Sequence, residues 1–239
     1  QADILNGDTS PFLLELFGYE RTLFVKVGQS IQTTMGMSFY EQTCKILGEQ
    51  VNYKVDLQKK AQGYISEEIE QYLQMLNRND YTPNRTKEFS EIRKMSKNVQ
   101  TAKENLVTEY PDSTVDVYIT TPEGKEILID ITTVKPNKKE FRILKEKTLR
   151  WASYRLTQNP NLEIETFFAI PYNPESSDEK GTIYERFNEY YDRKDLLVGD
   201  ELWKKVSGNQ CSIEDIKNIF KDLGAELQTE INKSFERIL

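Results

Sequence analysis

The chain has 239 residues, of which 37% are hydrophobic and 30% charged, which is typical of a globular protein of one domain or two small ones. It contains no histidine, so serine-hydrolase triads, histidine-paired cysteine nucleophiles, HExxH metalloproteases and zinc deaminases are excluded together. The net charge of -7 argues at first against a nucleic-acid partner, but residues 83–155 carry 15 basic and 11 acidic residues and are therefore basic.

The first half of the chain predicts helices. Residues 10–16 follow a serine cap with proline and apolar residues and predict a short helix. Ser66 is the expected N-cap of a helix that reaches about residue 77, and a polar helix is expected over residues 86–107. A further, buried amphipathic helix is predicted from residue 36 onward, because apolar residues recur there at spacings of three and four: Met37, Tyr40, Cys44 and Leu47.

The period then changes to that of β-strands. Residues 114–121 and 126–134 are rich in β-branched residues and flank a turn, so they predict a β-hairpin. Residues 138–158 predict a long helix, and residues 163–170 predict a third strand that is apolar enough to be central. Further helices are expected over residues 182–191, 200–206 and 212–239.

This order of elements predicts an α/β fold. We expect a mixed central sheet flanked by helices, with helical additions at both ends, because a hairpin is followed by a crossing helix and another strand. Residues 1–239 are expected to form a single domain, with a catalytic core over residues 30–175. The helical region 176–239 is a candidate for dimer or DNA contacts.

Two aspartates occupy apolar strand positions. Asp116 and Asp130 each lie between β-branched residues, on the two strands of the predicted hairpin. Burying a carboxylate costs several kcal/mol unless it is paired or bound to a metal. Two carboxylates on adjacent strands can share a divalent cation and, with a nearby lysine, form a site for phosphodiester hydrolysis. The alternative is that Asp116 faces outward and Asp130 pairs with a neighbouring lysine.

Residues 110–137, with the sequence YPDSTVDVYITTPEGKEILIDITTVKPN, resemble the core of PD-(D/E)XK nucleases, and more narrowly type II restriction endonucleases of the TdeIII-like group. Residues 33–47, 167–174 and 196–203 are similar to the same group. The resemblance implies a restriction-endonuclease-like core and a homodimeric, Mg²⁺-dependent enzyme without a small-molecule cofactor. It also implies cleavage of double-stranded DNA at a short G·C-rich palindrome of the GGNCC kind.

The resemblance also suggests roles for single residues. Asp116 matches the first metal-binding aspartate of the motif and Asp130 the second acid, while Glu41 matches a helix carboxylate that faces the metal site. The motif lysine should follow two positions after the second acid, where this chain has Thr132. Lys135 could replace that lysine if the strand ends or bulges after residue 132, or Lys145 could do so from the following helix.

The basic residues of the middle segment are candidate DNA contacts. Residues 135–150 carry seven basic and two acidic residues, although a solvated helix face would have the same composition. The candidates are Arg85, Arg93, Lys94, Lys97, Lys138, Lys139 and Arg142.

Two other functions remain open. With Thr132 in place of the lysine, the chain could be a catalytically impaired, DNA-binding pseudo-nuclease. A structural or protein-interaction role is also open, with the acidic carboxyl-terminal helices as its working surface. The two distant cysteines lack a CxxC spacing, and no run approaches the roughly 18 apolar residues that span a bilayer, so we expect a cytoplasmic protein without a membrane partner.

Overall fold

The structure is a computed structural model, and it describes residues 15, 22, 38–78, 81–99, 106–108, 113–132, 134–173 and 175–238. The predicted helix over residues 10–16 lies outside these residues except at Glu15. The chain divides into two compact units, and the unit of residues 40–214 contains the sheet and the candidate site. The other unit comprises residues 1–39 and 215–239 and contains most of helix α7 (Ile213–Ile238). Within this unit, the centre of the Phe39 ring lies 4.9 Å from that of the Phe220 ring.

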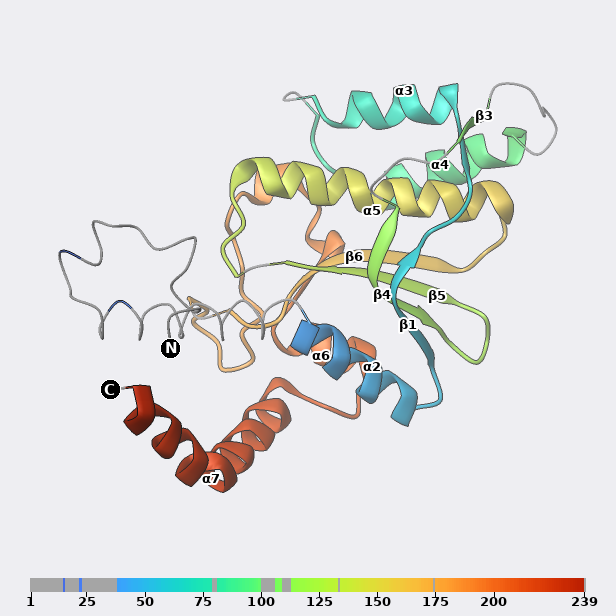
Figure 1. Ribbon diagram of the computed structural model, residues 1–239. Coiled ribbons are helices and arrows are strands. Elements are labelled where there is room, and N and C mark those ends of the chain that lie inside the picture. The colour runs from blue at the N-terminus through green and yellow to red at the C-terminus, as the bar shows by residue number, and fades with distance from the viewer. Residues whose placement is uncertain are drawn as a thin grey trace. The chain divides into compact units, whose positions relative to one another are not determined.

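A mixed sheet forms the centre of the unit of residues 40–214, as the sequence predicts, and it has five strands where three were expected (Figure 1). Its first three strands are antiparallel, and its last three are parallel. In spatial order, the strands are β1 (Lys54–Lys60), β4 (Thr114–Thr120), β5 (Glu126–Ile131), β6 (Ile164–Ile170) and β7 (Leu196–Val198). The edge strands β1 and β7 were not expected from the sequence. Strands β2 (Tyr64–Ser66) and β3 (Leu106–Thr108) pair separately.

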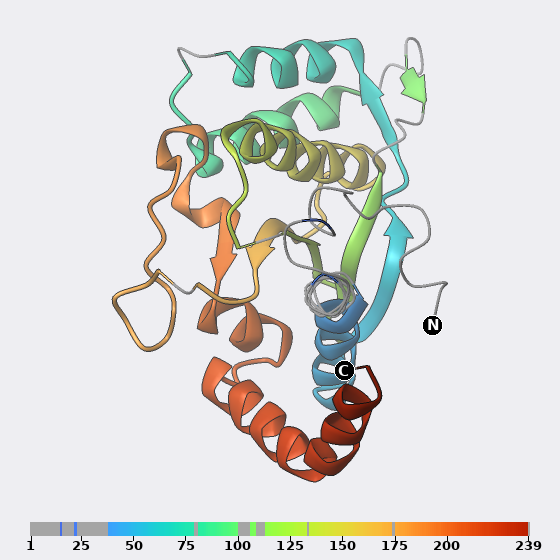
Figure 2. The same cartoon turned by 60° about the vertical axis from the view of Figure 1, so that its left-hand side comes forward.

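Helices lie on both sides of this sheet (Figures 1 and 2). One side holds α3 (Glu67–Leu76), α4 (Arg85–Val99) and α5 (Lys138–Gln158), and the other holds α2 (Tyr40–Gln50) and α6 (Asp200–Val206). This arrangement confirms the predicted α/β class and agrees with a restriction-endonuclease-like fold. Among the described residues, no helix is long and apolar enough to cross a membrane.

Helix α5 begins and ends at the predicted residues. The Asn137 side chain caps it by accepting hydrogen bonds from the backbone N–H groups of Lys139 and Glu140, at 2.9 and 3.1 Å. The Glu140 carboxylate in return accepts a hydrogen bond from the backbone N–H of Asn137, at 2.6 Å, which completes a capping box. Most of the helix is buried, and Trp151 is fully enclosed, so α5 lies at the centre of the core.

Three predicted elements differ from the structure. The predicted helix over residues 86–107 ends at Val99, and residues 106–108 are extended. The predicted strand 126–134 has its last assigned residue at Ile131. Residues 182–191 form no α-helix and contain only a 3-10 turn, Asn188–Tyr190, because Phe187 has a left-handed backbone with φ of 53°, which a right-handed helix cannot include.

Candidate active site

Asp116 and Asp130 lie opposite each other where β4 and β5 separate. The last paired residues of this ladder are Val117 and Ile129, and one further step places the two aspartates side by side. At this step the Asp116 carboxylate accepts a hydrogen bond from the backbone N–H of Ile131, at 2.7 Å. The Asp116 side chain therefore accepts the hydrogen bond that a backbone carbonyl of β4 would accept in a regular ladder. The hairpin thus places the two carboxylates next to each other.

Asp130 is the buried member of the pair, with 6% of its surface exposed. Burial raises the pKa of its carboxyl to about 6, and the neighbouring Asp116 carboxylate adds to the rise while Lys147 opposes it. Neighbouring carboxylates repel each other when both are ionised. A bound cation would reduce this repulsion and stabilise the ionised form of both aspartates.

Lys147 supplies a positive charge at this pair. Its ammonium group forms an ion pair with Asp130 Oδ1 and lies 5.1 Å from the centre of the Trp151 ring, one turn further along α5. The lysine side chain is 21% exposed, so it remains partly accessible to solvent while it contacts the buried ring. Helix α5 thus places a cation beside the second acid of the hairpin.

Glu41 approaches the same pair from the first turn of α2. The Gln58 amide, on β1, donates one hydrogen bond to Glu41 Oε2 at 3.0 Å and another to Asp116 Oδ1 at 3.2 Å. Burial raises the pKa of Glu41, and the Asp116 charge raises it further, while the hydrogen bond from Gln58 opposes the rise. The carboxylate expected from the sequence to face the site is therefore linked to it through one amide.

The two lysines expected to replace the motif lysine lie elsewhere. Thr132 continues the β5 backbone pairing, because its N–H donates to the Ala169 carbonyl at 2.9 Å. Lys135 lies beyond this point and pairs with Glu175 on the loop after β6. Lys145 is buried between two carboxylates on α4 and the 3-10 turn Arg193–Asp195, and it projects from α5 in a different direction from Lys147. Neither expected lysine occupies the position beside Asp130 that Lys147 fills.

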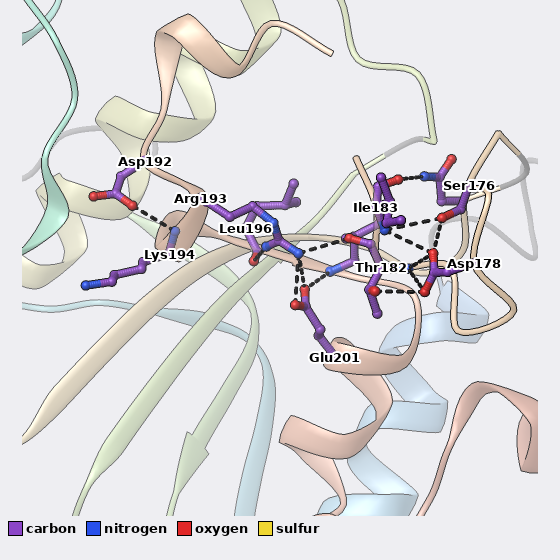
Figure 3. A network of polar contacts seen from close by, with 11 residues as sticks. Ser176, Asp178, Thr182, Ile183, Asp192, Arg193, Lys194, Leu196 and Glu201 are labelled. Carbon is purple, nitrogen blue, oxygen red and sulfur yellow. Dashed lines mark hydrogen bonds and ion pairs between the residues drawn. The ribbon is translucent and has the colours of Figure 1, made fainter. Parts of the chain in front are cut away.

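The loop that holds Glu175 is itself fixed by a polar network (Figure 3). Asp178 accepts hydrogen bonds from Ser176 and from both the backbone and the hydroxyl of Thr182. Arg193 then ties this loop to β7 and to α6, because it donates to the carbonyls of Thr182 and Leu196 and to both carboxylate oxygens of Glu201. Residues 175–183, the described part of this loop, are therefore held by polar contacts near the carboxyl ends of β6 and β7, the edge of the sheet at which Asp130 also lies.

The side chains at this site fit a hard divalent cation. They present carboxylate oxygens, the ligands that Mg²⁺ prefers, and Mg²⁺ usually needs only one or two carboxylates because it keeps several waters. Among the described residues, no three acidic or thiol side chains already surround a common point. Lys147 and Gln58 are bound to oxygens of the two aspartates in this arrangement, so a cation would compete with them for these oxygens.

The candidate DNA contacts fall into three groups. Two of them bind other parts of the protein: Arg85 forms an ion pair with the buried Asp195, and Arg93 donates to backbone carbonyls of the loop before β6. Arg142, partly buried on α5, lies 4.6 Å from the centre of the Tyr190 ring. Exposed positions on α4 and the first turn of α5 hold the others: Lys94, Lys97, Lys138 and Lys139.

Two residues of the site were not expected from the sequence. Lys147 is one of several basic residues of α5, the periodicity places it largely off the apolar face, and it is not among the buried residues of the helix, so the sequence does not distinguish it from its neighbours. Gln58 has no signal either, because the strand that carries it was not predicted.

Comparison with known proteins points to one class of enzyme. Residues 4–224 match the family described as "Type II restriction endonuclease, HinfI". The type II restriction enzyme MjaII of Methanocaldococcus jannaschii is 28% identical over 81% of this chain and 53% of its own length, so the chain spans about half of that relative. Two enzymes of Herpetosiphon aurantiacus, HgiCII and HgiEI, are each 22% identical over 95% of this chain and 82% of their own length.

No solved structure matches the chain. The family match nevertheless covers most of the sequence, including both aspartates, Lys147 and every strand of the central sheet. The resemblance of the hairpin to type II restriction endonucleases is thereby confirmed. The chain belongs to the HinfI family of type II restriction endonucleases.

Proposed function

We propose that this protein is a Mg²⁺-dependent type II restriction endonuclease that hydrolyses phosphodiester bonds of double-stranded DNA. The observation that carries the proposal is the meeting of Asp116 and Asp130 at the point where β4 and β5 separate, with Lys147 paired to Asp130. Two acids and one cation on different elements are the minimum set for metal-assisted phosphodiester hydrolysis. The expected site is G·C-rich and palindromic, of the GGNCC kind.

In this proposal Asp116 and Asp130 hold the metal ion, and Glu41 faces it from α2. The bound ion would polarise a phosphate oxygen and promote formation of hydroxide from water. Lys147 takes the role that the motif gives to the lysine at the position of Thr132. A fifth of its side chain is exposed, and the four-carbon stem of a lysine is flexible, so a DNA phosphate can compete with Asp130 for the ammonium.

Lys147 is supported in this role by geometry. A motif lysine at position 132 would lie on β5, two residues after Asp130. The Lys147 ammonium contacts the same aspartate, although Lys147 belongs to α5. An ammonium beside the scissile phosphate stabilises the charge that develops in the transition state. Because Lys135 and Lys145 are engaged with other carboxylates, Lys147 is the only one of these three lysines that pairs with Asp130.

Cleavage of a palindrome further suggests a homodimer. A two-fold axis in the protein would match the two-fold axis of the DNA, so that each subunit cuts one strand. The exposed lysines of α4 and α5 are the proposed phosphate contacts, and their binding should weaken steeply with salt. Sedimentation with and without a GGNCC duplex tests the dimer, and a monomer in both samples would reject it.

The direct test replaces each aspartate by asparagine. Asp116→Asn and Asp130→Asn should bind a GGNCC duplex but cleave phage DNA in Mg²⁺ at least about 100-fold more slowly, because each variant removes a metal-binding charge without changing side-chain size. The matched control is Asp56→Asn, which alters an aspartate of β1 that pairs with Lys59. Cleavage at the wild-type rate by either site variant would refute the assignment.

A second candidate function rests on Thr132. Threonine cannot supply a cation, so a chain with threonine at the motif position could bind its site without cutting, as a pseudo-nuclease. The two functions differ in one experiment, in which wild-type protein is incubated with phage DNA in Mg²⁺ and in Mn²⁺. Discrete fragments support the nuclease with Lys147 in the lysine role. Intact but bound DNA, with cleavage restored by Thr132→Lys, supports the pseudo-nuclease.

A further inference from the structure

Gln58 connects two acids that come from different parts of the fold. Its amide nitrogen is 3.0 Å from Oε2 of Glu41, on α2, and 3.2 Å from Oδ1 of Asp116, on β4. The amide carries two N–H groups, so it can donate one to each carboxylate. A neutral group with two donors is suited to holding two like charges near each other.

The backbone at Gln58 is unusual for a strand. Its φ angle is 50°, in the left-handed region that residues other than glycine seldom adopt. The β1–β4 register pairs Leu57 with Val117 and Lys59 with Val115, so Gln58 lies opposite Asp116. The strained residue is therefore the one that faces the site, which is where backbone strain is expected to have a functional reason.

The same row of the sheet continues to Asp130. Gln58, Asp116 and Asp130 are successive neighbours across β1, β4 and β5, and regular pairing is interrupted on both sides of Asp116. On the β5 side the Asp116 carboxylate accepts the N–H of Ile131, and on the β1 side it accepts the Gln58 amide. Both oxygens of Asp116 are thus oriented by donors from its two neighbouring strands.

We propose that Gln58 is a positioning residue, which orients Glu41 and Asp116 for the divalent cation of the active site. The proposal rests on the proposed function, because it assumes that Asp116 is a metal ligand. Without the amide, repulsion between the two carboxylates would drive the Glu41 side chain away from Asp116. The left-handed backbone at residue 58 turns the amide toward both acids.

The test measures metal affinity and cleavage in the full-length protein. Gln58→Met keeps the length of the side chain but has no N–H donor. It should weaken binding of Mn²⁺, measured by calorimetry without DNA, by about 10- to 100-fold, as losses of residues that support metal ligands do. The concentration of Mn²⁺ that gives half-maximal cleavage should rise in parallel, while the urea midpoint of unfolding stays close to that of the wild type.

The matched control is Gln71→Met on α3. The Gln71 amide also donates to a glutamate, Glu67 Oε1 at 3.2 Å, and this hydrogen bond is exposed like those of Gln58, but both of its residues belong to α3. Its Mn²⁺ affinity should equal that of the wild type. If Gln58→Met does not fold, Gln58→Asn replaces it, because asparagine tolerates positive φ and is one methylene too short to reach both acids.

The outcomes separate this inference from the proposed function. If Asp116→Asn loses Mn²⁺ binding while Gln58→Met or Gln58→Asn retains wild-type affinity, Gln58 has no positioning role although the metal site stands. If Asp116→Asn itself binds Mn²⁺ like the wild type, the metal site of the proposed function is wrong, and the role of Gln58 is rejected with it. A loss in both Asp116 and Gln58 variants, with Gln71→Met unaffected, supports the inference.

Discussion

Lys145 and Lys147 lie two residues apart on α5, but replacing Lys145 should mainly reduce stability, whereas replacing Lys147 should mainly reduce cleavage. The Lys145 ammonium contacts Glu88 and Asp195, whose side chains are fully buried. Replacing Lys145 by methionine keeps much of the apolar side chain but leaves these two carboxylates without their shared cation. Removing one partner of a buried ion pair typically destabilises a protein by about 3–5 kcal/mol.

The surrounding contacts place the expected loss at the lower end of this range. Asp195 keeps Arg85 as a partner at 2.8 Å, and Glu88 keeps a hydrogen bond from the backbone N–H of Asn84 at 3.0 Å. We therefore expect Lys145→Met to lose about 3 kcal/mol of unfolding free energy. For a chain of this size, that loss lowers Tm by about 6–12 °C.

Thermal unfolding followed by circular dichroism measures this change. The control is Lys135→Met, which breaks a surface pair with Glu175 and should leave Tm close to that of the wild type. The double variant Lys145→Met with Glu88→Gln should recover part of the loss, because one buried charge is then removed along with the cation. An unchanged Tm in Lys145→Met would refute the view that this lysine holds the two acids in the core.

Three further changes should each affect a different property. Lys147→Met should reduce the cleavage rate by about 100-fold or more at saturating metal, because it removes a transition-state charge, and should lower Tm less than Lys145→Met does, because Lys147 is partly exposed; cleavage at full rate would reject its catalytic role. Burial raises the pKa of Glu126, but hydrogen bonds from Arg155 and Tyr118 outweigh it and hold the pKa below its usual value. A carboxyl with a lowered folded-state pKa stabilises the protein above its unfolded-state pKa, so the urea midpoint should fall between about pH 5 and pH 3 more steeply in the wild type than in Glu126→Gln; parallel curves would contradict this. Arg193→Met should free the loop after β6 and increase hydrogen exchange at the Thr182 and Ile183 amides, while unchanged exchange would show that Asp178 alone holds them.

The parts of the fold that were predictable are those with a strong local pattern. The hairpin of β4 and β5 has a dense run of β-branched residues, and α5 has a cap at Asn137 and an uninterrupted helical period. Strand β1 was missed because its sequence, KVDLQKK, has only two apolar residues, and its partner β4 lies more than fifty residues away. Strand β7 has three residues, too few to show any period.

The candidate site was predictable only in part, for a similar reason. The two aspartates are visible in the sequence because each interrupts an apolar strand, and their register follows from a short turn. The choice among Lys135, Lys145 and Lys147 depends on which direction each side chain takes from α5 or the loop before it. That direction is decided by tertiary packing, in particular by Trp151 beneath Lys147 and by Glu88 beside Lys145.

The capping box at Asn137 determines the rotational phase of α5. Each residue turns an α-helix by about 100°, so the residue at which the helix starts decides which side chains point toward β5 and which toward α4. One residue inserted after the cap and before Leu144 would bring Glu146 to Asp130 and Leu144 to the carboxylates of Glu88 and Asp195. The residue at which α5 begins therefore determines both the charge beside Asp130 and the cation that neutralises Glu88 and Asp195 in the core. An insertion of this kind would change both together.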